Sequence, residues 1–187
     1  MSYHQKIEAK LNNLQKEFFR LFRKTFPELS DKIEIEKGII SPDNFCFSIK
    51  SLSEVFGKLH FDIDDTEITV FSKFDHSHFP TYYYENEKNP QRRNQLACIS
   101  ALEYIKEFVR GNIIIECELQ DDKILKSVEY HKDNPTSFFS ATLNLKEEPK
   151  RKSIIIKFRK FIQKSQKQAI VKKKVNWFGE INDFQQI

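Results

Sequence analysis

The sequence predicts a single α+β domain over residues 1–187, in which an N-terminal helix and a central buried helix pack on a mainly antiparallel sheet. The length fits one domain, and the hydrophobic fraction of 39% can form a core beneath a charged surface. Eighteen Phe residues against four Gly and six Pro disfavour disorder, because burial of aromatic rings offsets much of the entropy lost on ordering. The apolar residues follow a helical period in some segments and a strand period in others, which indicates both kinds of element.

Residues 1–27 are predicted to form the first helix. Apolar residues recur there at alternating spacings of four and three, which directs one stripe toward a core. The stripe consists of Ile7, Leu11, Leu14, Phe18 and Leu21. Phe19, Phe22 and Phe26 widen it into a face suited to packing on a sheet. Pro27 ends the helix, because proline lacks the N–H that the next turn would need.

Residues 32–85 are predicted to form antiparallel strands, because apolar and polar residues alternate along them. In one strand Leu59, Phe61 and Ile63 alternate with polar neighbours. The Asp64-Asp65 corner that follows is predicted to be a hairpin turn, since Asp tolerates turn geometry. One face of this sheet is therefore expected to be buried and the other wet.

Residues 89–111 carry the clearest helix signals in the chain. Asn89 is a suitable cap, Pro90 suits the first helical position, and Gly111 can close the end. Two neighbouring apolar stripes cover a broad arc, which predicts a largely buried helix. One stripe contains Ala97, Ala101, Tyr104 and Phe108, and the other contains Cys98, Leu102, Ile105 and Val109.

Residues 113–180 are predicted to return to strands, with a basic insertion near residues 146–174. The Asp121-Asp122 pair is a predicted turn, and a last short strand is expected from Lys174 to Glu180. Residues 153–168 fit both a helix and a strand, because an Ile triplet lies within a helical spacing of apolar residues.

The cytoplasm is the predicted location. Cys46, Cys98 and Cys117 are odd in number and lie in apolar stretches, so we expect buried free thiols in a reducing compartment. No apolar run approaches the length that a membrane helix requires, and Met1–Lys10 lacks the apolar core of a secretory signal. The sequence thus predicts no membrane partner.

The charge is unevenly distributed. The net charge is +4, but Leu145–Ile187 holds 12 Lys or Arg against four Asp or Glu, a net +8, which leaves −4 for residues 1–144. The basic stretch Lys150–Lys174, with Phe158 and Phe161, is an alternative nucleic-acid-binding segment. A Lys-rich solvated face, which discourages edge-to-edge aggregation, is the favoured interpretation.

Two groups of residues were candidates for catalysis. Strand alternation places His60, Asp62 and Asp64 on one face, where they could hold a divalent metal in a metal-dependent enzyme. The solvated face of an amphipathic strand is the favoured interpretation. His76 and His78 form a second pair, for which a hydrogen-bonded polar loop is favoured over a metal site. The sequence has no Gly-rich phosphate loop, nucleophile elbow or CxxC, so we expect no enzyme, metal or cofactor.

The order of motifs after Gly57 resembles that of a known family. An acidic strand and a second strand are followed by a His-rich aromatic segment and a long helix. The matching stretches are Gly57-Lys58-Leu59-His60-Phe61-Asp62-Ile63, Ile68-Thr69-Val70-Phe71, His76-Ser77-His78-Phe79, Tyr82-Tyr83-Tyr84-Glu85, the helix from Gln91 to Arg110, and Trp177-Phe178-Gly179. Over about two-thirds of the chain this order resembles the immunity proteins of bacterial polymorphic-toxin and contact-dependent growth inhibition systems.

The resemblance implies a binding protein that neutralises a cognate toxin, here a nuclease, by occluding its active site. Carboxylates would steer the association with a cationic cleft, and aromatic rings would form the centre of the interface. Nucleic acid is the less favoured partner. The residues expected to bind the toxin are Asp62, Asp64, Asp65, Glu67, Asp75, His76, His78, Phe79, Tyr82, Tyr84 and Glu85.

Overall fold

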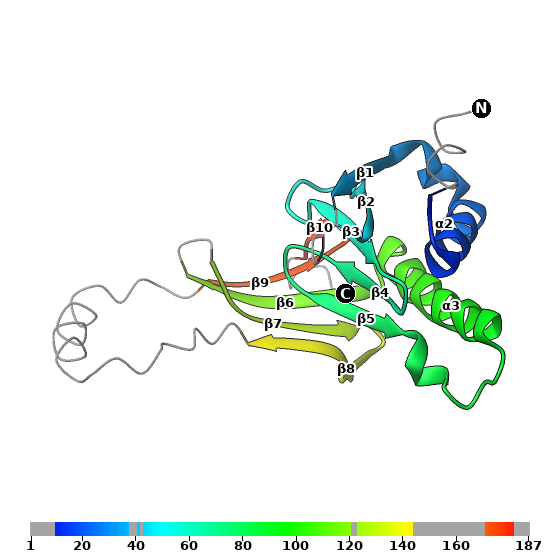
Figure 1. Ribbon diagram of the computed structural model, residues 1–187. Helices are drawn as coiled ribbons and strands as arrows, with labels where there is room; N and C mark the ends of the chain where they lie inside the picture. The colour runs from blue at the N-terminus through cyan, green and yellow to red at the C-terminus, as the bar shows by residue number, and fades with distance from the viewer. Residues whose placement is uncertain (1–9, 38–40, 42, 121–122, 144–170, 182–187) are drawn as a thin grey trace, which may run out of the picture.

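The computed structural model in Figure 1 confirms the α+β class. It describes residues 10–37, 41, 43–120, 123–143 and 171–181. The strands of this part divide between two antiparallel five-stranded sheets, a division that the sequence did not predict. The first sheet has the order β1-β2-β3-β4-β5, and the second has the order β10-β9-β6-β7-β8.

The first sheet follows the alternation predicted for residues 32–85. Its strands are β1 (Ile33–Lys37), β2 (Phe45–Lys50), β3 (Lys58–Ile63), β4 (Glu67–Phe71) and β5 (His76–Pro80). Phe47 of β2 lies opposite Phe61 of β3, which lies opposite Val70 of β4, so these side chains share the apolar face. Cys46, Asp62 and Thr69 occupy the same strands on the other face and are buried, so the prediction that this face is wet is wrong at its centre, where neighbouring strands cover these side chains.

Helix α2 (Asn13–Thr25) packs on the apolar face of the first sheet. It begins with a capping box, in which Asn12 accepts a hydrogen bond from the Gln15 backbone N–H and the Gln15 side chain accepts one from that of Asn12. The Phe18 ring lies 6.0 Å from that of Phe61. The predicted helix therefore begins at Asn13 within the described residues, and its predicted residues 1–9 lie outside them. A short 3-10 helix, η1 (Pro27–Lys32), follows.

Helix α3 (Pro90–Val109) has the predicted start and end. Asn89 accepts hydrogen bonds from the backbone N–H groups of Gln91 and Arg92, and Gly111 takes a φ of 72° that a side chain would disfavour. The predicted stripes are buried except for Val109, which is half-buried. In Figure 1 helix α3 lies beside α2, at the end of the molecule where the first sheet is located.

The second sheet is built from the C-terminal strands. They are β6 (Ile113–Gln120), β7 (Lys123–His131), β8 (Asn134–Leu143), β9 (Val171–Asn176) and β10 (Gly179–Glu180). The single last strand predicted over residues 174–180 is wrong, because Trp177 and Phe178 form a turn between two strands. The turn predicted at 121–122, the segment 153–168 and most of the basic insertion at 146–174 lie outside the described residues.

One core joins the two sheets. The Phe56 ring, from the loop between β2 and β3, lies 5.7 Å from Phe108 of α3 and 5.6 Å from Trp177 of the second sheet. Cys46, Cys98 and Cys117 are buried free thiols, as predicted. None of the helices in the described part of the chain combines the length and the apolar character that a membrane crossing needs.

Candidate functional site

The exposed carboxylates predicted to bind a partner begin at the turn between β3 and β4. Asp64 shapes this turn, because its Oδ1 accepts hydrogen bonds from the backbone N–H groups of Thr66 (2.6 Å) and Glu67 (2.7 Å). The Asn12 side chain donates to the Asp64 carbonyl at 3.1 Å and ties the turn to the start of α2. Asp65 projects from the turn and is exposed.

A second segment lies against this turn. It is the 3-10 helix η2 (Thr81–Tyr84), which follows β5, and the Thr81 N–H donates to the Thr66 carbonyl at 2.8 Å. Tyr82 and Tyr83 are 59% and 67% exposed, and their ring centroids are 5.1 Å apart. We call the surface formed by the two segments the acidic aromatic corner. It consists of Asp64, Asp65, Glu67, Tyr82, Tyr83 and Glu85.

The surroundings of the corner affect the pKa of Tyr82. Desolvation, followed by the charges of Tyr83 and Glu67, raises the pKa of the Tyr82 phenol. Tyr82 is therefore a hydroxyl donor at neutral pH, while the exposed carboxylates beside it carry the negative charge. The corner thus presents aromatic surface and anionic groups together.

Two predicted contact residues lie inside the protein. Asp62 is 1% exposed, because it lies on the central strand β3 between Cys46 of β2 and Thr69 of β4, and it accepts a hydrogen bond from the Asn44 side chain. Asp75 is 6% exposed, and its carboxylate accepts a hydrogen bond from the His76 N–H at 2.8 Å. Neither carboxylate can contact a partner that docks on the surface.

The three residues of the alternative metal site have separate partners. The His60 Nδ1 donates to Glu36 Oε2 at 2.8 Å, whereas Asp62 pairs with Asn44 and Asp64 shapes its turn. Among the residues that the structure describes, no three His, Cys, Asp or Glu side chains are arranged to hold a metal ion.

Glu36 is the centre of a polar cluster on this face of the first sheet. Ser48 and Lys58 also donate to Glu36 Oε1, at 2.7 and 3.1 Å. Desolvation raises the pKa of Glu36, but hydrogen bonds from Ser48, His60 and Lys58 outweigh it, and the pKa is lowered. Glu36 is therefore a charged and well-partnered carboxylate.

The segment from His76 to Phe79 belongs to β5, so the polar loop predicted there is wrong. The reason is that β5 lies at the edge of the first sheet, where alternate residues can be polar. The His78 Nδ1 contacts the Glu67 carboxylate. Thr69 Oγ1 lies 3.3 Å from the same His78 Nδ1. The His76 and His78 ring centroids are 4.9 Å apart.

An apolar groove of about 410 Å³ lies between β5 and α3. Its lining consists of Phe79, Ile99, Ser100, Glu103, Tyr104, Glu107 and Ile113. The Tyr84 hydroxyl lies 2.5 Å from Ser100 Oγ and so fixes η2 to α3. Tyr84 is thus an anchor within the protein, whereas Tyr83, which the sequence analysis did not single out, is the exposed ring.

A buried carboxyl group lies beneath the groove. Glu129 of β7 is 1% exposed, and the Tyr104 hydroxyl lies 2.7 Å from each of its carboxyl oxygens. The Ser77 hydroxyl donates to Tyr104 Oη at 3.0 Å. Desolvation raises the pKa of Glu129 to about 8, so this carboxyl is protonated at neutral pH. No sequence pattern around Glu129 marked it, because its burial depends on contacts between the sheets and α3.

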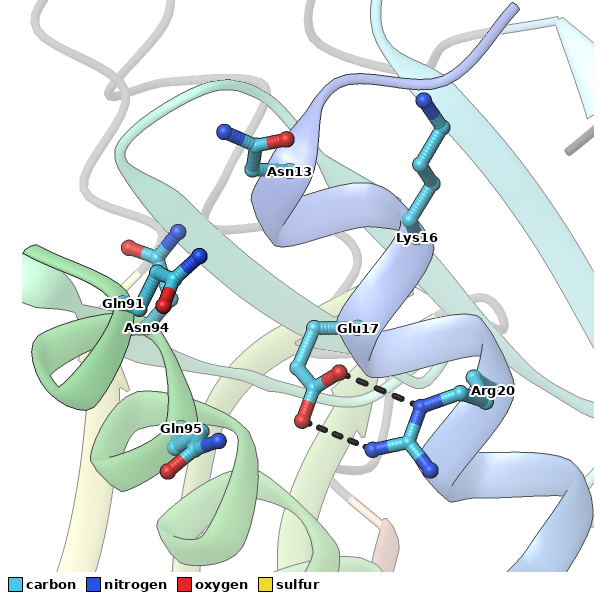
Figure 2. A pocket seen from close by; sticks show the side chains of 7 residues that line it. All are labelled: Asn13, Lys16, Glu17, Arg20, Gln91, Asn94 and Gln95. Carbon is cyan, nitrogen blue, oxygen red and sulfur yellow. Dashed lines mark hydrogen bonds and ion pairs between the residues drawn. The ribbon is translucent and has the colours of Figure 1, made fainter. Parts of the chain in front are cut away.

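A second, polar pocket of about 320 Å³ lies between the first turns of α2 and α3 (Figure 2). Its lining consists of Asn13, Lys16, Glu17, Arg20, Gln91, Asn94 and Gln95. Two of its charges neutralise each other, since Arg20 and Glu17 form the ion pair at 2.9 Å that Figure 2 shows. The pocket offers amides and water-exposed charges but no apolar anchor, so the corner and the groove are the stronger candidates.

No protein-family model, curated protein or solved structure matches this chain.

Proposed function

We propose that this protein is an immunity-type protein, which binds a cognate bacterial toxin in the cytoplasm and blocks its active site. The toxin would be a nuclease with a cationic cleft. The observation that carries the proposal is the exposed Tyr82–Tyr83 pair on η2. This pair lies beside the carboxylates of the turn between β3 and β4.

The chemistry of the corner suits a basic protein partner. Tyr rings provide large contact areas at low entropic cost, and they are frequent at the centres of protein interfaces. A Lys or Arg side chain can lie over such a ring and pair with Asp65 or Glu85 at its edge. The same carboxylates would speed association with a cationic cleft through long-range attraction.

The local support of the corner also favours binding over catalysis. The Asp64 carboxylate is used to shape the turn, and the Tyr84 hydroxyl is used to fix η2. The rings of Tyr82 and Tyr83 are therefore presented in a preformed arrangement, which lowers the cost of ordering an interface.

Co-expression with a candidate toxin, taken from a neighbouring gene that encodes a secreted protein with a toxic C-terminal domain, tests this proposal. The wild-type chain is expected to restore growth, and Tyr82→Ala with Tyr83→Ala is expected to weaken toxin binding at least a hundredfold, a typical loss for two interface anchors. Asp65→Lys with Glu85→Lys should chiefly slow association and reduce its dependence on salt.

Matched controls are available at the other end of β3, in the exposed loop before it. Leu52→Ala and Glu54→Lys change an apolar and an acidic exposed residue there and should leave rescue and binding unchanged. Full rescue by the double Tyr variant, or no effect of the wild-type chain on the toxin, would contradict the proposal.

A further inference from the structure

We infer that the groove between β5 and α3 binds an extended segment of another polypeptide, which adds to the edge of β5. The segment would direct apolar side chains into the groove and a Lys or Arg side chain toward its rim. This surface lies beyond the acidic aromatic corner, and the inference does not require the partner to be a toxin.

The first argument is the open edge of β5. In the described part of the chain β5 pairs only with β4, and β8 of the second sheet comes near it without pairing. Just before and just after β5, a backbone hydrogen bond of 2.8 Å joins the chain to the β4 side. One runs from the Ser72 N–H to the Asp75 carbonyl, and the other from the Thr81 N–H to the Thr66 carbonyl. Because alternate residues of an antiparallel strand bond to one neighbour, the intervening residue His78 directs its N–H and C=O away from β4.

The second argument is the apolar lining beside this edge. Phe79 of β5 and Tyr104 of α3 form one part of the groove, with ring centroids 5.3 Å apart, and Ile113 of β6 also lines it. Ile99 is 46% exposed, an unusual amount for a large apolar side chain on a helix that is otherwise well packed. An added strand would cover it with every second side chain, since side chains alternate between the two faces of a strand.

The third argument is the charge of the lining. Its two ionisable carboxylates are Glu103 and Glu107, and its other residues carry no charge at neutral pH. A hydrogen bond from Asn112 is the largest cause that lowers the pKa of Glu107, which also pairs with His131 at 3.1 Å and Arg110 at 3.4 Å, so Glu103 is the carboxylate that is more open to a new cation. Glu103 pairs with Lys106 of the same helix at 3.1 Å, an exposed ion pair of the kind that contributes little. An incoming Lys or Arg can therefore replace Lys106 as the partner of Glu103 at a small cost in free energy.

The experiment uses the full-length protein and a fluorescent pool of nine-residue peptides in which Lys alternates with Val, Ile or Phe. Anisotropy titration is expected to show saturable binding. Ile99→Asp should weaken it at least tenfold, because a charge would enter the apolar groove, and Glu103→Lys should weaken it severalfold. Both side chains are exposed enough to be changed without loss of the fold. Leu52→Asp and Glu54→Lys, in the loop before β3, serve as matched controls and should bind like the wild type.

Two further peptide pools and one amide test the geometry. A pool with Glu in place of Lys should bind at least tenfold more weakly, and a pool with alternate backbone N-methylation should lose binding, because strand addition needs those N–H groups. Exchange of the His78 amide hydrogen should slow when the Lys pool is added. Absence of binding by the Lys pool, equal binding by Ile99→Asp, or unchanged His78 exchange would each overturn the inference. None of these results depends on the toxin experiment, so the two proposals can fail separately.

Discussion

The two sheets shift the pKa of a buried or half-buried glutamate in opposite directions. In the first sheet Glu36 receives hydrogen bonds from Ser48, His60 and Lys58, and its pKa is lowered. In the second sheet Glu129 is buried against the Tyr104 hydroxyl, and its pKa is raised to about 8. Two glutamates on strands of one domain therefore differ in charge at neutral pH. The difference follows from the surroundings: several hydrogen-bond donors favour the ionised form of Glu36, whereas burial favours the neutral form of Glu129.

The largest expected effect comes from the aromatic core that supports the first sheet. Phe47→Ala should lower the free energy of unfolding by about 3–5 kcal/mol, because the ring is fully buried and lies 4.6 Å from that of Phe61. Denaturant unfolding followed by tryptophan fluorescence measures this, because Trp177, the single Trp of the chain, lies in the turn between β9 and β10 and is buried in the shared core. A single shared transition is expected because one core joins the sheets. Loss of the first sheet with Trp177 unaffected would contradict that continuity. Leu52→Ala, at an exposed position, is the control.

The second prediction concerns Glu129. Its folded pKa is above the unfolded value of about 4.5, so the stability that it contributes is fully present below pH 4.5 and is lost as the pH rises toward 8. Glu129→Gln keeps the shape of the side chain and removes its ionisable group. The free energy of unfolding of the variant should therefore lack a slope of about 1.4 kcal/mol per pH unit over that window. Unfolding at pH 5, 6, 7 and 8 measures the slope. Parallel curves for variant and wild type would show that Glu129 is ionised in the folded protein.

The smallest of these effects is expected for Glu36, with the opposite sign. Its folded pKa is below the unfolded value, so its contribution is present above pH 4.5 and is lost as the pH falls through the folded pKa. Glu36→Gln should therefore be less stable than the wild type at pH 7, and the two should converge in acid. The side chain is only partly buried, so the difference is expected to be slight. A deficit that grows as the pH falls would contradict this sign.

Local signals in the sequence were sufficient for the elements but not for their assembly. Asn89, Pro90 and Gly111 marked α3 correctly, because caps and helix ends depend on neighbouring residues. The separation into two sheets depends on pairing between distant strands, such as β6 with β9, which no local pattern records. The same limit explains β5, whose polar alternation is typical of an edge strand as well as of a loop.

The candidate site shows the same limit at the level of single residues. Alternation placed Asp62 and His60 on the correct face, but neighbouring strands decide that Asp62 is buried. Three consecutive tyrosines have similar local surroundings, and only the packing of η2 on α3 anchors Tyr84 while Tyr83 stays exposed. The sequence is therefore sufficient to locate the corner, whereas the structure is needed to tell which of its side chains are exposed.

The three buried cysteines give the protein built-in probes of opening. A thiol reacts as the thiolate, and burial raises the pKa of Cys98 to about 12, so alkylation requires the chain to open around it. Cys46 lies in the first sheet, Cys98 in α3 and Cys117 in the second sheet. The relative alkylation rates of these thiols therefore report whether the two sheets separate from the helix together or one at a time, without any engineered label.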